Sequence, residues 1–201
     1  MKSVNPAPLG LSGFAFTTWL LSMINAGWYL PTAMPMVLAM AFAFGGTAQF
    51  VAGVCELPRG NSFGFTAFCA YGSFWWSLAL FLMFPHAAVP ASFVGWYLAL
   101  WGVFTLFMWF ATFTANRAVS SVFLLLWITF FLLAAGEWTD IVLLHRLGGY
   151  GGLATAIAAL YLAAATIINE ANDRVLLPIG PYDPLRGTPA IVGDRRLPGR
   201  G

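Results

Sequence analysis

Four long stretches of the chain contain no Asp, Glu, Lys or Arg. They hold 53, 57, 19 and 23 residues and lie between Lys2 and Glu56, Arg59 and Arg117, Arg117 and Glu137, and Arg146 and Glu170. A charged side chain at the centre of a bilayer costs at least about 2.5 to 3.5 kcal/mol, so such gaps are typical of membrane spans. A spanning helix needs roughly 20 residues. The first two gaps therefore hold two helices each and the last two hold one each, which predicts six.

The composition also places the chain among membrane proteins. Hydrophobic residues make up 60% of the sequence and charged residues 8%, against about 25% charged in soluble proteins. Barrel strands alternate apolar and polar residues over about ten positions, whereas SFWWSLALFLMF at residues 73–84 is apolar on every side. The spans are therefore expected to be helices. One basic residue before a long apolar run favours a retained first helix over a cleaved signal peptide.

Prolines mark the breaks inside the two longest gaps, because proline removes a backbone donor and disfavours continuation of a helix. Pro31 and Pro35 divide the first gap, and Pro85 and Pro90 divide the second. The expected spans cover residues 10–30, 34–55, 63–84, 93–113, 119–138 and 150–169. The glycine-rich GGYGG at residues 148–152 is interpreted as a flexible start to the sixth helix.

The basic residues predict the orientation. With six spans, both termini and the second and fourth connections share one side of the membrane. Eight of the nine Lys and Arg residues fall on that side, and only Arg146 falls on the other. The positive-inside rule then places both termini in the cytoplasm. Residues 1–169 form the transmembrane channel domain, and residues 170–201, with five prolines, form a cytoplasmic tail. The expected location is the plasma (inner) membrane, as a multi-pass protein.

Neutral polar residues inside the spans indicate a polar path or bonds between helices, because polar groups in lipid must find partners. These residues are Ser12, Thr17, Thr18, Ser22 and Asn25 in the first span, Thr47 and Gln49 in the second, and Thr66, Tyr71, Ser73 and Ser77 in the third. Glu137, Asp140 and the two histidines lie at or beyond span ends and are interpreted as solvated. No span has a charge at its centre, so no ion pump or proton relay is indicated.

Sequence motifs of catalysis and metal binding are lacking. The chain has no HExxH, no Cys and His cluster at metal spacing and no phosphate-binding loop. The sequence therefore predicts no enzyme, no catalytic residue, no metal, no cofactor and no nucleic-acid partner. Small residues recur four apart, as in Thr155, Ala159 and Ala163, which predicts close helix packing and an oligomer. The natural inference is a six-helix bundle that passes a small solute.

Several motifs, in order along the chain, resemble one known family. They are NPAPLGLSGFAFTT (residues 5–18), GGTAQFVAGVCELPRGNSFGFTAFCAYGSFW (45–75), YLALWGVFTLFMW (97–109) and VLLPIG (175–180). They look like the acetate uptake transporter family, whose bacterial members are called succinate-acetate permeases. The resemblance implies six transmembrane helices, a homo-hexamer with one pore in each protomer, and passage of acetate, succinate and related carboxylates.

The resemblance also implies which residues form the pore. Its constriction of bulky apolar and aromatic side chains falls on Phe14, Tyr71 and Leu126, and Ala159 aligns with a small position that influences which acids fit. Because no basic residue lies in a span, a carboxylate would depend on backbone donors and on polar side chains. The candidates for this polar lining are Thr17, Ser73 and Gln49. The alternative is that the neutral acid passes.

The motif NPAPLG is the expected entrance at the cytoplasmic end of the pore. Pro6 and Pro8 hold the chain extended, Gly10 permits close backbone approach, and Asn5 can cap or bind neighbouring backbone. The connection YLPTAMPM (residues 29–36) and the tail are longer than is common in the family, so substrate preference transfers less securely. A channel for a small neutral solute such as urea remains the alternative function, and a sensor that binds an acid without carrying it remains a third.

Overall fold

The computed structural model describes residues 4–84 and 88–180, and the regular structure of these residues is helical. Six helical units are long and apolar enough to cross a membrane, which confirms the predicted number. Their bounds are Ala7–Asn25, Pro31–Arg59, Ser62–Met83, Ala91–Thr114, Arg117–Thr139 and Val142–Ala171. The single helices among them are α1 (Ala7–Asn25), α4 (Ser62–Met83), α5 (Ala91–Ala111, extended by the short η4, Thr112–Thr114), α6 (Arg117–Thr139) and α7 (Val142–Ala171).

Local sequence explains where several of these helices begin. Asn61 and Asn116 precede α4 and α6, and their side-chain oxygens accept hydrogen bonds from Gly64 N at 3.0 Å and Val119 N at 2.9 Å. These side-chain caps satisfy backbone donors that have no partner inside the helix. Pro8 lies in the first turn of α1, where a missing N–H costs nothing.

Two predicted span limits are wrong. Helix α1 ends at Asn25 rather than at residue 30, because Gly27 has a φ of +81° and leaves the helical path. Helix α7 begins at Val142 rather than at residue 150, so GGYGG is helical and not a flexible start. A Cβ on Gly149 would lie 2.2 Å from Ala26 N. The glycines therefore serve close packing of α7 on α1.

The second membrane unit is composite. It contains η1 (Pro31–Ala33), α2 (Met34–Met40), the π-helical segment η2 (Ala41–Ala48), α3 (Gln49–Cys55) and η3 (Leu57–Arg59). In η2, the Thr47 hydroxyl donates to Phe42 O, five residues back, at 2.7 Å. π-helical segments are rare in proteins. Where they do occur within a helix, they often lie at a functional site. This segment packs on α1 and α4, and no feature of the sequence predicted it.

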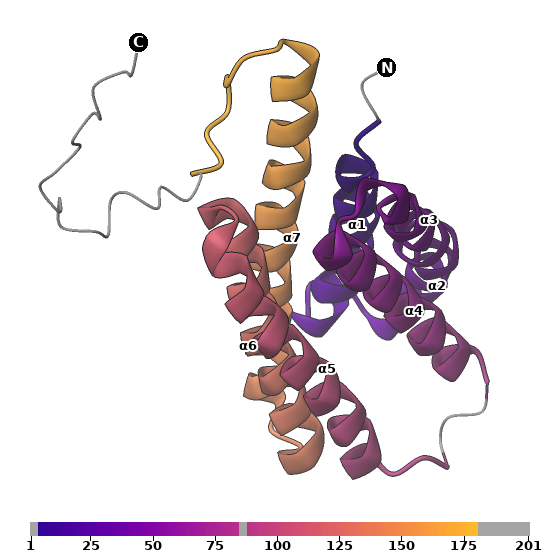
Figure 1. Ribbon diagram of the computed structural model, residues 1–201. Coiled ribbons are helices and arrows are strands. Elements are labelled where there is room, and N and C mark those ends of the chain that lie inside the picture. Colours follow the sequence, from indigo (N-terminus) through magenta and orange to yellow (C-terminus); the bar gives the residue numbers. More distant parts are fainter. Residues whose placement is uncertain (1–3, 85–87, 181–201) are drawn as a thin grey trace, which may run out of the picture.

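The helices are arranged as a bundle in which α1 is central (Figure 1). Helix α1 packs on α7, α7 on α6, and α6 on α5, while α3 and η2 pack on α4 and α1. The start of α1 and the end of α7 lie at the same end of the bundle (Figure 1). Helices α4 and α5 meet through side chains, including a Tyr71 to Thr105 hydroxyl bond of 2.8 Å. This arrangement leaves α1, α4, α5 and α6 facing a common interior.

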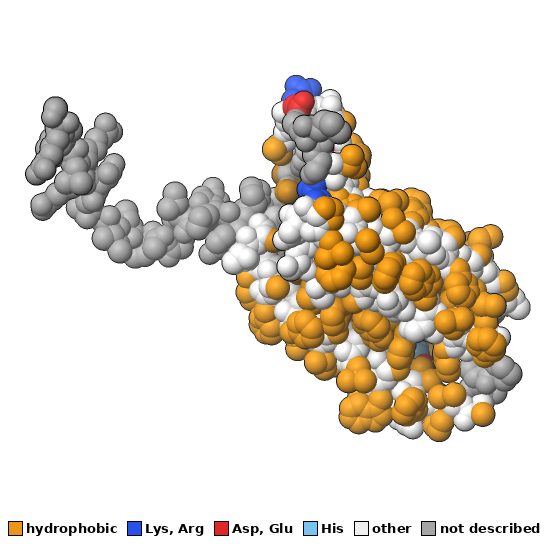
Figure 2. Space-filling model, turned by 45° about the vertical axis from the view of Figure 1, so that its right-hand side comes forward, with side chains coloured by type: hydrophobic (Ala, Val, Ile, Leu, Met, Phe, Trp, Pro, Cys, Tyr) orange, Lys and Arg blue, Asp and Glu red, His pale blue; other side chains and the backbone are white. Residues whose placement is uncertain are grey.

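The surface seen in Figure 2 is mostly hydrophobic, and charged groups gather on the projecting end of the molecule. Helix α5 carries large exposed apolar side chains at helical spacing. They are Phe93, Trp96, Leu100, Val103, Phe107 and Phe110. Lipid tails or a neighbouring protomer would cover such a stripe in a membrane.

The segment after α7 folds back on the bundle. Gly180 O and Ile179 O accept hydrogen bonds from Arg117 N at 2.8 Å and Ala118 N at 3.1 Å, at the start of α6. Helix α7 continues to Ala171, two residues past the predicted end of the sixth span, and the residues from Asn172 to Gly180 form neither helix nor strand. Residues 181–201 lie outside the described residues.

Candidate functional site

Two cavities enter the bundle from opposite ends. The large cavity has a volume of about 420 Å³ and is lined by the end of α1, the end of α4, the start of α5, the end of α6 and the start of α7. The small cavity has a volume of about 160 Å³ and is lined by residues such as Ala7, Glu56, Asn61 and Val119, near the starts of α1, α4 and α6. The two cavities therefore lie toward opposite ends of the bundle.

Phe14 and Leu126 line both cavities, so they stand at the boundary between them. Tyr71 lines the small cavity beside them, and its ring centroid lies 5.9 Å from that of Phe14. All three side chains are at most 5% exposed. The structure thus brings together the three residues of the predicted constriction, from α1, α4 and α6.

Other aromatic rings complete this boundary, and they were not among the residues predicted to form it. The centroids of Phe74 and Phe130 are 5.4 Å apart, and those of Tyr71 and Phe123 are 6.1 Å apart. Phenylalanine is common in these spans, so the residue type alone does not indicate which phenylalanines line a cavity. Thr105, which holds the Tyr71 hydroxyl, could have been found as a polar residue inside an apolar span.

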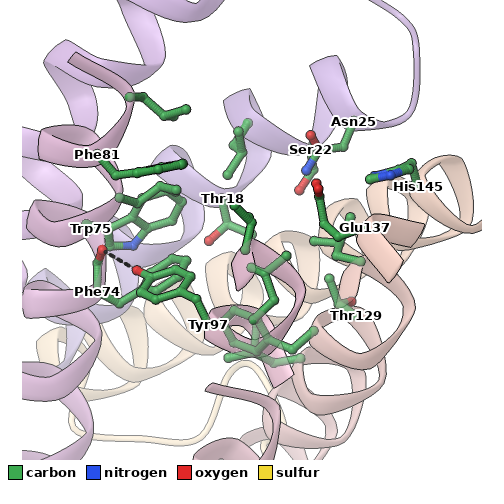
Figure 3. Close-up of a pocket in the computed structure, with 18 of the residues that line it drawn as sticks. Thr18, Ser22, Asn25, Phe74, Trp75, Phe81, Tyr97, Thr129, Glu137 and His145 are labelled. Atoms are coloured by element: carbon green, nitrogen blue, oxygen red, sulfur yellow. Dashed lines mark hydrogen bonds between the residues drawn. The ribbon is translucent and has the colours of Figure 1, made fainter. Parts of the chain in front are cut away.

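Besides Glu56 Oε2, which is described below, three buried polar atoms beside the cavities have no hydrogen-bond partner within the described part of the chain. They are Thr18 Oγ1, Trp75 Nε1 and Gln49 Oε1. Thr18 and Trp75 line the large cavity (Figure 3), and Gln49 lines the small one. A buried polar group without a partner costs about 1 to 3 kcal/mol, so a polar solute or water in the cavities would stabilise them.

Of the three residues predicted to form the polar lining, one lines a cavity and two do not. Gln49 lines the small cavity and is 1% exposed. The Thr17 hydroxyl instead donates to Gly13 O at 2.8 Å, within α1, and a Cβ on Gly45 of η2 would lie 2.6 Å from it. The Ser73 hydroxyl donates to Cys69 O at 2.9 Å. Neither Thr17 nor Ser73 lines the two cavities described here, and both bond to backbone in their own helix.

Glu56 is an acidic group of the small cavity that the sequence analysis passed over. Its side chain is 1% exposed. Arg59 Nε lies 3.1 Å from Glu56 Oε2, close enough for an ion pair although not aligned as a hydrogen bond. Arg59 Nη1 also donates to Val4 O at 2.8 Å. The pair holds the chain before α1 against the second membrane unit.

The motif NPAPLG lies beside the small cavity. Asn5 Nδ2 donates to Glu170 Oε1 at the end of α7, and Asn5 Oδ1 accepts from Ala7 N at 3.1 Å. Pro6 and Pro8 are buried, and the prediction that they hold the chain extended is wrong, because Pro6 has helical φ and ψ of −80° and −13° and Pro8 lies in the first turn of α1. A Cβ on Gly10 would lie 2.7 Å from the ring of Phe68. The motif therefore fixes the start of α1 against α4 and α7.

Ala159 is fully buried on α7 and does not line the two cavities. It belongs to the same hydrophobic core as Phe14 and Leu126. Among residues 4–84 and 88–180, no group of three His, Cys, Asp or Glu is placed to hold a metal ion.

The mouth of the large cavity is amphipathic. One wall carries the rings of Phe74, Trp75, Phe81 and Tyr97, from α4 and α5. The other wall carries Ser22 and Asn25 of α1, Glu137 of α6 and His145 of α7 (Figure 3). Such a vestibule suits a small solute with one polar and one apolar end.

The sequence profile of the GPR1/FUN34/yaaH family matches residues 1–182. The chain is 44% identical over 183 residues to the succinate-acetate/proton symporter SatP of Escherichia coli (strain K12), covering 89% of this chain and 96% of that protein. It is 37% identical over 206 residues to acetate permease A of Emericella nidulans, covering 91% of this chain and 68% of that protein.

A solved structure of the bacterial acetate channel SatP has the same fold. Its TM-score with this chain is 0.85 at 44% sequence identity, and the match covers 89% of this chain and all of the solved chain. The chain and the solved structure are therefore similar in sequence as well as in fold.

Proposed function

The chain belongs to the GPR1/FUN34/yaaH family, and we propose that it passes acetate and related short-chain carboxylates across a membrane. Relatives named as a succinate-acetate symporter, an acetate permease and an acetate channel support this substrate class. The protein acts as a channel or permease and not as an enzyme.

One observation supports this function most directly. Two cavities approach each other from opposite ends of the bundle and meet at Phe14 and Leu126, with Tyr71 against Phe14. A short acid would cross the membrane by passing from one cavity to the other between these side chains. The narrow apolar boundary favours a permeant with a small apolar part.

The buried polar atoms define how such a solute would be held. Thr18 Oγ1–H and Trp75 Nε1–H are donors that a carboxyl oxygen can accept from in the large cavity. Gln49 on the other side of the boundary offers a carbonyl oxygen as an acceptor and an amide N–H₂ as a donor. At the boundary an apolar ring of side chains strips water from the solute, which is costly for an ion. The neutral acid meets a smaller barrier there than the anion.

We place the large cavity outside the cell and the small cavity on the cytoplasmic side. The bias of basic residues supports this orientation, because Arg59 ends η3, Arg117 begins α6 and Arg174 follows α7, at the end of the bundle where α1 starts. The plasma membrane and a homo-hexamer with one pore in each protomer complete the proposal. The small residues of α7 do not support the hexamer, because Ala156, Ala159 and Ala163 are buried within the protomer.

Uptake of radiolabelled acetate into proteoliposomes that contain only this protein tests the function. We expect uptake well above that of empty vesicles at acid and at neutral pH. No flux at either pH would overturn the proposal. Urea is the control solute, because a neutral boundary would also suit a urea channel: fast urea swelling in stopped flow that acetate does not inhibit would favour that alternative instead.

A further inference from the structure

Two titratable side chains share the mouth of the large cavity. Glu137 lies in the last turn of α6 and His145 in the first turn of α7, and both line the cavity while half-buried. The constriction between the cavities carries no group that is charged near neutral pH. The role of Glu137 and His145 is therefore separate from the narrowing at Phe14.

The turn between α6 and α7 brings the two side chains together. Asp140 has a φ of +54°, which ends α6 and lets α7 begin at Val142. A Cβ on Gly136 would lie 2.8 Å from Cδ2 of His145, so the imidazole rests on α6 one residue before Glu137. Trp138 Nε1 donates to Ser92 O at 3.0 Å and holds the end of α6 on α5.

The neighbouring polar groups are neutral. Figure 3 shows the carboxyl end of Glu137 directed toward Ser22 and Asn25 of α1, with the ring of His145 on the same side of the cavity. The aromatic wall of α4 and α5 lies opposite. A short carboxylic acid could place its carboxyl group near these polar side chains and its alkyl end against the rings.

The charged groups close to the pair do not line the cavity. Asp140 lies in the turn, and Arg146 lies over Gly27, where a Cβ would be 3.5 Å from its Nε. The lining residues from α1, α4 and α5 within the described part of the chain include no Asp, Glu, Lys or Arg. His86 lies outside the described residues. Among the described residues, Glu137 and His145 therefore set the charge of this mouth.

The charge of the mouth depends on whether its imidazole carries a proton. With an ionised carboxylate and a neutral imidazole, the pair is negative and repels a carboxylate anion. With a protonated imidazole the pair is neutral, and histidine is in general the side chain that changes charge between about pH 5 and pH 8. The neutral pair favours the approach of an anion, because local charge at a cleft controls the concentration of charged solutes there.

We propose that Glu137 and His145 form an acid-responsive recruitment site for carboxylate anions at the mouth of the large cavity. The inference rests on the proposed function and deepens it. A lower pH then increases transport in two ways. It raises the fraction of neutral solute in solution, and it removes the repulsion of anions by the protein at the cavity mouth.

Acetate flux at symmetric pH tests the site, because at any given pH the neutral fraction of acetate is the same for every variant. The proteins are wild type, Glu137→Gln, His145→Gln, the double variant, and Asp140→Asn as the matched control. Asn tolerates a positive φ, and Asp140→Asn removes one charge from the same turn without changing the cavity lining.

At pH about 7.5 we expect Glu137→Gln to raise flux about 2- to 5-fold, the range expected for one partly exposed charge. At pH about 5.5 we expect His145→Gln to lower flux by a similar factor. The double variant should show a smaller ratio of acid to neutral flux than wild type, and Asp140→Asn should match wild type.

Failure of the recruitment site and failure of the proposed function give different results. Acetate flux with the same acid-to-neutral ratio in all five proteins would overturn the recruitment site and leave the proposed function intact. No acetate flux in wild-type vesicles would overturn both. Circular dichroism and size-exclusion profiles establish that each variant is folded. A loss of flux at both pH values in the folded Glu137→Gln variant would also overturn the site, because the carboxylate would then be required for passage and not inhibitory.

Discussion

At the scale of residues, the protein narrows its interior with side chains that have no charge. Phe14, Tyr71 and Leu126 come from three helices, and each is almost completely buried. Tyr71 is held on its far side by the 2.8 Å bond to Thr105. The position of the Tyr71 ring is thus fixed by a hydrogen bond and by packing, so the width between the cavities depends on few atoms.

Removing either ring at the boundary should widen it. We expect Phe14→Ala and Tyr71→Ala to raise the ratio of succinate to acetate flux roughly 10-fold, because discrimination of this size depends on pocket volume. Tyr71→Phe is the matched control: it keeps the ring and loses only the bond to Thr105, at a cost of about 0.5 to 1.5 kcal/mol. Competition uptake in proteoliposomes measures the ratio. An unchanged ratio in folded alanine variants would mean that these rings do not limit passage.

Asn5 joins the start of α1 to the end of α7 through Glu170. Asn5→Ala should therefore impair acetate uptake several-fold without preventing membrane insertion. Glu170→Ala removes the other partner of the same bond and should give a similar defect, with a double variant no worse than either alone. Uptake is normalised to the amount of protein in the membrane. Additive defects would show that the two residues act separately.

At the scale of elements, the chain after α7 completes the start of α6. The backbone donors of Arg117 and Ala118 have no partner inside α6, and Gly180 O and Ile179 O accept from them. Asn169 fixes this segment: its Oδ1 accepts from Leu176 N at 2.8 Å and Leu177 N at 2.9 Å, and its Nδ2 donates to Leu177 O at 2.8 Å. Asn169 of α7 thus positions the segment that reaches from the end of α7 to the start of α6.

Asn169→Ala should destabilise the folded protein by about 1 to 3 kcal/mol, because it leaves partly buried backbone groups without partners. Asn172→Ala is the matched control at the residue that follows α7, since the Asn172 amide is exposed and donates to Ile168 O within the same turn. Thermal unfolding in detergent compares the two. Equal midpoints for both variants would contradict the role of Asn169.

At the scale of the whole molecule, a single chain encloses both cavities. The lining of both comes from one chain, so passage does not require a path between protomers. The exposed stripe of α5 is available to lipid or to a second copy. A hexamer would then contain six separate paths and not one shared axis.

Flux through mixed assemblies tests this arrangement. Leu126→Trp adds a large ring where the two cavities meet and should close that path. If each protomer conducts alone, flux should fall in proportion to the share of Leu126→Trp protomers, whereas a shared axial path would fail after one or two blocked copies. Native mass spectrometry of assemblies of the 21.8 kDa chain gives the number of copies and should show six.

The sequence determined the number of helices, because the cost of burying charge in lipid confines charged residues to span ends. It also carried the family resemblance, through motifs such as NPAPLG. Only the tertiary structure decided which polar residues face a cavity. Thr17 and Ser73 bond to backbone in their own helices, while Thr18 and Gln49 are left without a full set of partners beside the cavities.

The physical reason is that membrane spans are apolar on all sides, so the pattern of hydrophobic residues does not tell which face of a helix points inward. Rotation of each helix is set by contacts between helices. Gly149 against Ala26 sets α7 on α1, and Gly136 against His145 sets α7 on α6. Because of those contacts, Glu137 and His145, which were predicted to be solvated at span ends, line one cavity mouth. Their spacing along the chain did not reveal this position.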